Sequence, residues 1–513
     1  YMVPAATMQI DKIPLNVNGK VDKRKLPEIK AESSKKKNSA PRELTFLEKK
    51  ISAIIEKIIG HSDFDISENL INAGMTSLSV IKLAVELNKA FGFEAQVKKM
   101  MKGCSVLSIE DELQEFMFSG TANPQTVKKE EKKEHKALYP LSKTQLGVYI
   151  DCMKNPYSTL YNIPSILTFS KSVDAQKLAD CVVKVIKAHP YIMTHLSLEN
   201  DDIEQTYVDS AKPNVPVEKL TEEQLESYKK DFVKPHNLMK APLFRISVAE
   251  TEKAVYLLSD FHHLIFDGAS VALFFEQLKT LYEGGNIEPE SYTYFDYAEN
   301  EIKAESSDEF RNAEKFFDNM MKNFESASEI TADLRGHAED GALASQAVPV
   351  DMARVENFCS QHGITPAHLF LAGTFYAVSR FVNSRNVYIS TISNGRSDMR
   401  LTNCFGMFVK TLALGIEIED ITSLEFVEKS KAVFTDSIEN EIYPYAQLCA
   451  KYGYAPNIMY EYQLGVVDNL EIDGKAVVRD YLEMNTAKFK TAIHIEDYKG
   501  CLLYTSDAAD DPY

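Results

Sequence analysis

The sequence predicts a chain of several domains, in which a small helical bundle precedes a larger mixed α/β domain. The first observation is length, because 513 residues correspond to about three units at roughly 150 residues per domain. The second is a pair of polar, charge-dense stretches, Lys30–Arg42 and Ser119–Lys136, which cannot bury a core and are typical of solvated linkers. The third is the hydrophobic pattern, which is helical between the linkers and mixed after them.

The linkers set the expected domain boundaries. We expect a stub at 1–30, a linker at 31–42, the bundle at 43–118, a second linker at 119–137 and the large domain at 138–500. Within the stub, Asn18-Gly19 lies between Val17 and Val21 and predicts a tight hairpin turn, because both turn positions need a positive φ.

The segment between the linkers has three runs with helical periodicity. Apolar residues recur every three or four positions, as expected for helices that bury one face. The apolar positions are Leu44, Leu47, Ile51, Ile54, Ile55 and Ile58, then Val80, Ala84, Leu87 and Phe91, then Ile109, Leu113 and Phe116.

The large domain alternates short apolar runs with helical patterns. Ala254–Leu258, Val387–Ile392 and Met407–Leu414 have the length and composition of buried strands, whereas Val271–Leu281 has helical spacing. This mixture predicts an α/β domain.

Composition and charge exclude several classes of protein. The 57 basic and 75 acidic residues give a formal net charge of -18, which argues against a protein that coats nucleic acid or an anionic membrane. No run approaches the roughly 18 apolar residues of a membrane helix, and residues 1–11 lack the features of a signal peptide, so we expect a cytoplasmic protein.

The seven cysteines form no C-x-x-C pair and are expected to be reduced thiols. No G-x-S-x-G, P-loop or G-x-G-x-x-G motif occurs, which disfavours common hydrolases, ATPases and dinucleotide enzymes.

Ser77 follows a glycine-containing loop and begins a predicted amphipathic helix. One interpretation is a helix cap, because a serine hydroxyl there accepts a hydrogen bond from a free backbone N–H group. The other is a modification site, because the positive end of a helix favours an attached phosphate. Spacing alone leaves both open.

The segment 261–268, Phe-His-His-Leu-Ile-Phe-Asp-Gly, directly follows an apolar strand and resembles a catalytic loop. His263 has the side chain to exchange a proton near neutrality, Asp267 could fix the loop by pairing with a cation, and Gly268 lets backbone approach a ligand. A zinc site is the competing interpretation. It is disfavoured because adjacent residues of an extended segment, such as His262 and His263, point to opposite faces.

Arg396 stands just after another apolar strand, in the segment Asn394-Gly395-Arg396. Exposed arginines usually improve solubility, but Asp267 needs a cationic partner. We therefore expect a buried pair between Asp267 and Arg396.

The order of the motifs resembles a fragment of a nonribosomal peptide synthetase. The stub resembles the closing motif of an adenylation domain, the segment around Gly74 resembles a peptidyl carrier domain, and the remainder resembles a condensation domain with the H-H-x-x-x-D-G signature. The motifs that carry the resemblance are Ile13–Asp22, Lys25–Pro27, Gly74–Leu78, Tyr139–Gln145, Ala241–Arg245, His262–Gly268, Tyr294–Ala298, Asn394–Arg396 and Gly406–Leu412.

The resemblance implies roles for particular residues. Ser77 would carry a covalent phosphopantetheine arm, Lys20 would match the lysine that contacts the adenylate intermediate, and ATP and magnesium would serve only the missing adenylation core. The condensation domain would consist of two chloramphenicol-acetyltransferase-like lobes with His263 in a tunnel between them. His263 would be catalytic, backbone near Gly268 would help to hold the developing oxyanion, and His262, Asp267 and Arg396 would be structural. No metal is implied.

The resemblance also implies partners and a reaction. A phosphopantetheinyl transferase, an upstream adenylation core and a downstream carrier domain would be required, and the product would be a peptide bond between a donor on Ser77 and an amine on the downstream carrier. Alternatives are an epimerisation domain, a free coenzyme A-dependent acyltransferase and a noncatalytic docking scaffold. Gly415 and Ala269 depart from frequent family residues, and Lys184–Leu196 lacks the second arginine of a family motif.

The two ends of the sequence are expected to be artificial edges. The chain begins with Tyr1 in the middle of a motif, and residues 502–510 resemble translated sequencing-adapter DNA. We therefore expect 501–513 to be a non-native tail and the condensation domain to be truncated at its C-terminus.

Overall fold

The structure is a computed structural model that describes residues 44–508 except for 63, 72, 76, 92, 94, 119–135, 200–201, 209–212, 331–341, 349, 464–469, 481–488 and 499–500. The stub with Lys20, the first linker, most of the second linker and residues 509–513 lie outside this description. Among the described helices, none is long and apolar enough to cross a membrane.

The segment between the linkers is helical, as the periodicity predicted. Its four helices are α1 (Phe46–Ile59), α2 (Ser77–Phe91), α3 (Val97–Lys102) and α4 (Val106–Phe118). A reciprocal pair of hydrogen bonds starts α1, because the Glu48 N–H donates to Thr45 Oγ1 at 3.0 Å and the Thr45 N–H donates to Glu48 Oε2 at 2.6 Å. Fully buried side chains from three helices form the core, including Ile51, Ile55, Leu83, Ala84, Leu87, Val106 and Leu113.

The first half of the large domain is built on a five-stranded sheet in the order β14-β2-β7-β6-β5. These strands are β2 (Asn162–Ser170), β5 (Val217–Lys219), β6 (Phe244–Glu250), β7 (Ala254–His262) and β14 (Val478–Asp480). β7 is buried along its whole length, because β2 and β6 flank it and helices cover the sheet. It therefore positions the residues that follow it.

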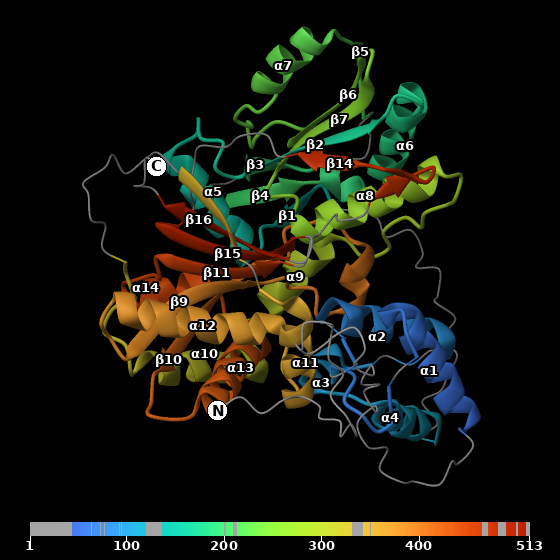
Figure 1. The fold of residues 1–513 in the computed structure, drawn as a ribbon. Helices are drawn as coiled ribbons and strands as arrows, with labels where there is room; N and C mark the ends of the chain where they lie inside the picture. The colour runs from blue at the N-terminus through green and yellow to red at the C-terminus, as the bar shows by residue number, and fades with distance from the viewer. Residues whose placement is uncertain are drawn as a thin grey trace, which may run out of the picture. The chain divides into compact units, whose positions relative to one another are not determined.

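Different helices cover the two faces of this sheet (Figure 1). Side chains of α6 (Ala175–Ala188) and α8 (Gly268–Tyr282) pack with Leu257 and Phe261 of β7 in the main core. Side chains of α7 (Glu222–Lys230) pack with Tyr256 and Leu258 of the same strand in a second cluster. The alternation along β7 is the two-residue period of a strand buried on both sides.

The second half contains a six-stranded sheet in the order β10-β9-β11-β15-β16-β8. Its strands are β8 (Ala342–Val348), β9 (Asn386–Ser393), β10 (Lys410–Glu417), β11 (Ile458–Gln463), β15 (Thr491–Tyr498) and β16 (Cys501–Ala508). β11 runs parallel to β9 and β15, and the other pairs are antiparallel. This sheet is also covered on both faces, by α12 (Pro366–Phe381) on one and by α10 (Asp308–Met321) and α14 (Tyr445–Tyr452) on the other.

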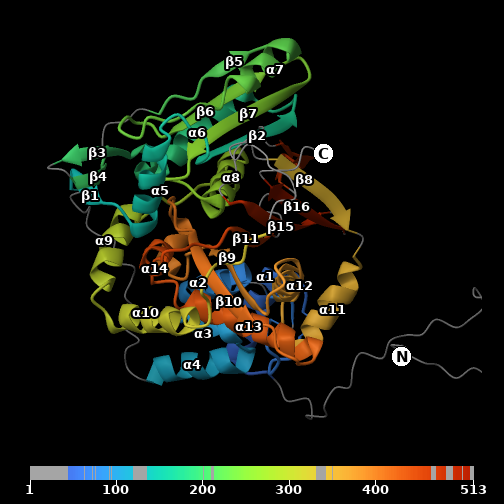
Figure 2. The ribbon, with the colours of Figure 1, turned by 90° about the vertical axis from the view of Figure 1, so that its left-hand side faces the viewer.

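The remaining described elements include two smaller sheets, β1-β4-β3 and β12-β13, and Figure 2 shows the fold from a second side. β14 follows the strands of the second sheet up to β11 in sequence but pairs with β2 of the first, so the chain crosses between the two halves. The remaining elements are β1 (Leu138–Pro140), α5 (Lys143–Lys154), a 3-10 turn at Pro190–Met193, β3 (His195–Glu199), β4 (Asp202–Thr206), α9 (Tyr294–Ala304), α11 (Met352–His362), a 3-10 turn at Met399–Asn403, α13 (Ser423–Glu439), β12 (Glu471–Ile472) and β13 (Lys475–Ala476).

The structure extends two of the sequence-based expectations. The apolar run Ala254–Leu258 was predicted as a strand, and β7 continues four residues further to His262. Residues 501–508, which the sequence analysis left out of the fold, form β16 between β15 and β8. Sheet pairing uses backbone groups that any extended segment offers, so the non-native origin of 501–513 stays a prediction.

Candidate functional site

The histidine pair lies where β7 ends and the chain turns into α8. The His263 N–H donates to the Tyr161 carbonyl at 2.7 Å, which ties the start of the loop to the segment before β2. The Ile265 N–H donates to the His262 carbonyl at 3.1 Å and the Phe266 N–H to the His263 carbonyl at 3.3 Å. These bonds fold the loop tightly before α8 begins at Gly268.

His262 is buried, with 4% of its surface exposed, and its ring is held by the loop itself. The Leu264 N–H donates to His262 Nδ1 at 3.1 Å, so Nδ1 is the acceptor nitrogen of a neutral ring. The other ring nitrogen, Nε2, lies 3.9 Å from Cys152 Sγ, and the ring packs edge-on against His236 at a centroid distance of 5.8 Å. These contacts support the structural role expected for His262.

His263 is half-buried, in contrast to its neighbour. β7 ends at His262, so His263 is the first residue of the turn that follows the strand. The cavity described below, along the edge of β6, is not lined by His263. The tunnel that the resemblance implies therefore stays a prediction.

Asp267 and Arg396 are in direct contact, as the sequence analysis expected. Arg396 Nη2 lies 3.1 Å from Asp267 Oδ1, and both side chains are buried. Asp267 also caps α8, because its Oδ1 accepts from the Ser270 N–H at 2.8 Å. Its Oδ2 accepts from the N–H groups of Phe408 and Val409 at 2.9 and 3.3 Å. One carboxylate thus joins the loop between β7 and α8 to the segment that carries the Gly406–Leu412 motif.

The Arg396 guanidinium has further partners besides this carboxylate. Nη1 donates to the carbonyls of Leu401 and Cys404 at 2.6 and 2.8 Å, and Nη2 donates to Ser270 Oγ at 2.8 Å. Its planar head also lies 4.4 Å from the centroid of the Phe408 ring. The sequence analysis missed Ser270, although its position three residues after a capping aspartate is the usual place for a bonded N–H group.

Gly268 is exposed at the first position of α8. A Cβ atom built on it would meet no atom within 4 Å, so packing within the protein does not exclude an alanine there. The backbone at this helix start is consequently open to an approaching ligand, which suits the role that the resemblance implies.

A second buried carboxylate stands before the histidine pair, and the sequence analysis did not identify it. Asp260 Oδ2 accepts from Arg245 Nη1 at 2.7 Å and from Asn162 Nδ2 at 2.9 Å, and it lies 3.4 Å from His236 Nε2. The contact between His236 and His262 extends this group to the loop between β7 and α8. Arg245 was noted only as part of a motif, and no spacing rule links it to Asp260 before the register of β6 and β7 is known.

Ser77 is the first residue of α2, and the turn before it requires a glycine. Gly74 has a φ of +91°, and the Met75 N–H donates back to the Leu70 carbonyl at 3.0 Å, which directs the chain into the helix. The first turn of α2 carries no acidic residue, so nothing there opposes a phosphate at the positive helix end. This local chemistry fits a phosphopantetheine arm.

Comparison with known families matches both parts of the chain. The family described as "Condensation domain" matches residues 135–463, and the family described as "Phosphopantetheine attachment site" matches residues 49–111. Bacitracin synthase 3 of Bacillus licheniformis is 26% identical over 504 residues, covering 95% of this chain and 8% of that protein. Surfactin synthase subunit 2 of Bacillus subtilis (strain 168) is 26% identical over 458 residues, covering 88% of this chain and 12% of that protein. The chain therefore spans about a tenth of these relatives.

Solved structures share the fold of the large domain. The first condensation domain of the calcium-dependent antibiotic synthetase aligns with a TM-score of 0.62 and 15% identity, covering 73% of this chain and 91% of that one. The condensation domain of the Monacolin K polyketide synthase aligns with a TM-score of 0.64 and 17% identity, covering 73% and 92%. The large domain thus has the two-lobed α/β condensation fold, with one lobe on each main sheet. The chain belongs to the condensation domain family and carries a phosphopantetheine attachment domain before the condensation domain.

Proposed function

We propose that this chain is a carrier and condensation segment of a nonribosomal peptide synthetase, which forms an amide bond between an acyl donor tethered at Ser77 and an amine on a downstream carrier. The observation that carries the proposal is the loop between β7 and α8. It presents a half-buried histidine and an open helix start, and it is fixed from both sides by buried contacts. The order of a carrier followed by a condensation domain supports the same reaction.

Phosphopantetheine on Ser77 supplies the thiol that carries the donor. The reaction exchanges a carbon–sulfur bond for a carbon–nitrogen bond, and the proton lost by the amine balances the thiol that is released. His263 is the group in the loop that moves this proton or holds the reacting nitrogen by a hydrogen bond. The N–H groups at the start of α8, beside Gly268, favour the negative charge that develops on the carbonyl oxygen.

The proposal assigns three partners. A phosphopantetheinyl transferase modifies Ser77, an adenylation core lies upstream and contains the site that Lys20 serves, and a second carrier downstream delivers the amine. The matched synthases are about ten times as long as this chain, which supports a larger assembly of this kind.

The first test is modification of Ser77. The chain is incubated with coenzyme A and a phosphopantetheinyl transferase, and its intact mass is measured. We expect one added phosphopantetheine group on the wild type and none on Ser77→Ala. A gain of mass by Ser77→Ala, or no gain by the wild type, would remove the carrier assignment.

The second test is product formation by His263→Ala. This variant should accept a loaded arm normally, because modification takes place on the carrier, but its amide product should fall by about a hundredfold to ten-thousandfold. Mass spectrometry of the product from preloaded partners measures the effect, and melting curves show whether the variant folds. His362→Ala, at an exposed histidine of α11, is the matched control and should keep wild-type activity. Near-wild-type product from His263→Ala would eliminate His263 as the catalytic residue.

A further inference from the structure

The first half of β6 has an open edge. β6 pairs with β7 along its whole length, but on its other side β5 pairs only with residues 248–250. The Val248 N–H donates to the Pro216 carbonyl at 2.9 Å, and parallel pairing would next require an N–H at position 216 to reach the Ile246 carbonyl. Proline has no N–H, so the ladder stops there. The Ile246 N–H and C=O therefore point away from β7 with no strand partner among the described residues.

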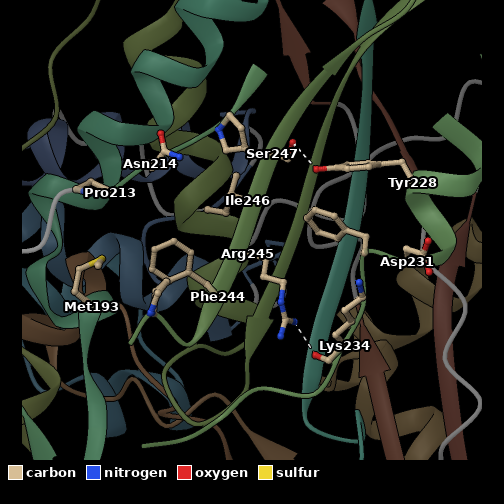
Figure 3. A pocket seen from close by; sticks show the side chains of 13 residues that line it. Met193, Pro213, Asn214, Tyr228, Asp231, Lys234, Phe244, Arg245, Ile246 and Ser247 are labelled. Carbon is tan, nitrogen blue, oxygen red and sulfur yellow. Dashed lines mark hydrogen bonds between the residues drawn. The ribbon is translucent and has the colours of Figure 1, made fainter. Parts of the chain in front are cut away.

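A cavity of about 560 Å³ lies along this edge (Figure 3). It is lined from both faces of the sheet, because alternate residues of β6 point to opposite sides. Phe244 and Ile246 belong to the cluster on the α8 face, whereas Tyr228 and Phe232 belong to the cluster on the α7 face. A ligand in extended conformation along the edge would find apolar surface on both of its sides.

Three polar side chains that line the cavity, those of Arg245, Tyr228 and Ser247, are already engaged. Arg245 donates from Nη1 to the Lys234 carbonyl and to Asp260, and from Nη2 to the Pro235 carbonyl, at 2.6 to 2.7 Å. The Tyr228 hydroxyl donates to Ser247 Oγ at 3.0 Å. The exposed charges that line the cavity, Lys234 and Asp231, have opposite signs. The lining thus favours an uncharged ligand that supplies backbone donors and acceptors, which is the chemistry of an added peptide strand.

A chain of side-chain contacts links the cavity to the loop between β7 and α8. Arg245 lines the cavity and contacts both Asp260 and His236, at 2.7 and 3.1 Å. The His236 ring in turn packs against His262.

We propose that the open edge of β6 binds an extended, uncharged peptide as an additional strand, and that this peptide is the upstream part of a peptidyl donor. The second half of the statement rests on the proposed function. It assigns the chain to elongation of a donor that already contains several residues.

Equilibrium binding of a capped peptide tests the edge without any chemistry. The full chain is titrated with acetyl-Val-Ala-Leu-Ala-Val-amide by calorimetry, and the titration is repeated with peptides N-methylated at one amide at a time. Because alternate amides of a strand face the same edge, methylation at every second amide should weaken binding about tenfold and the intervening methyl groups should change it less than about twofold. No binding, or equal effects at all amides, would overturn the proposal.

A variant at the mouth of the cavity provides the second test. Asn214 is exposed and lines the cavity, so Asn214→Trp should obstruct it and weaken the capped peptide at least about tenfold. Asn286→Trp, at an exposed asparagine outside the cavity, is the control. In product assays, Asn214→Trp should raise the KM for a peptidyl donor and leave a single aminoacyl donor unaffected. If Asn214→Trp leaves the KM for the peptidyl donor at the wild-type value, the edge site is overturned. If the wild type forms no product from any donor, the result counts against the proposed function instead.

Discussion

Two buried carboxylates flank the histidine pair, and they are held in different ways. Asp267 uses both oxygens, which accept from the guanidinium of Arg396 and from the N–H groups of Ser270, Phe408 and Val409. Asp260 uses only Oδ2, which accepts from Arg245 and Asn162, and its Oδ1 has no donor among the described residues.

The partners of the two carboxylates also come from different places. Those of Asp260 lie in the same sheet, on β2 and β6. Those of Asp267 come from its own helix and from residues 396–409, beside the strands of the second sheet. The comparison teaches that Asp267 holds one lobe to the other, whereas Asp260 supports the loop within a single lobe. Removing Asp267 should therefore cost more stability than removing Asp260.

The largest expected effect is that of Asp267→Ala. Removal of one partner of a buried pair typically costs about 3–5 kcal/mol, because the remaining charge is left uncompensated. Chemical denaturation followed by circular dichroism measures the free energy of unfolding. The control is Asp420→Ala, which breaks an exposed pair with Arg385 and should cost less than about 1 kcal/mol. If both variants unfold alike, Asp267 does not hold the lobes together.

Replacement of Arg396 by lysine tests the geometry of the same pair. Lysine keeps the charge but loses the planar fork that reaches Asp267 and the carbonyls of Leu401 and Cys404. We expect Arg396→Lys to lower the free energy of unfolding by about 2 kcal/mol. Arg385→Lys, in an exposed pair with Asp420, should be nearly neutral in the same denaturation experiment. A neutral Arg396→Lys would show that charge alone holds this contact.

A smaller effect is expected for Asp260→Asn. The asparagine can keep an oxygen toward Arg245, and that guanidinium also bonds to two carbonyls and is 31% exposed, so it is not left uncompensated. The expected cost is about 1–2 kcal/mol, measured by the same denaturation experiment. A cost as large as that of Asp267→Ala would contradict the expectation that Asp260 contributes less to stability than Asp267.

The sequence predicted the buried contact of Asp267 but not that of Asp260, and the difference has a physical reason. Asp267 belongs to a short motif with its histidines, and the need of a buried anion for a cation pointed to Arg396. The role of Asp260 depends on which residue of β6 lies opposite it, and only the register of β6 and β7 in the folded chain places Arg245 there. Likewise, the crossing of β14 to β2 joins segments some 300 residues apart, which local periodicity cannot predict.

The smallest effect concerns the pH dependence of the unfolding free energy, which we expect to come from His368. His368 caps α12, where its Nδ1 accepts from the Thr365 N–H at 3.1 Å. Burial, and to a lesser degree the charge of Lys431, lower the pKa of His368 to about 4 from the usual 6.5. Because protonation is easier in the unfolded chain, the contribution of this histidine is complete above pH 6.5 and is lost as the pH falls from 6.5 toward 4.

Between pH 6 and pH 5 this loss amounts to about 1 kcal/mol of unfolding free energy. His368→Gln, which cannot be protonated, should flatten that part of the stability profile. His362→Gln, at the exposed histidine of α11, should leave the profile unchanged. If His368→Gln retains the wild-type slope between pH 6 and pH 5, the acid sensitivity in this range does not come from His368.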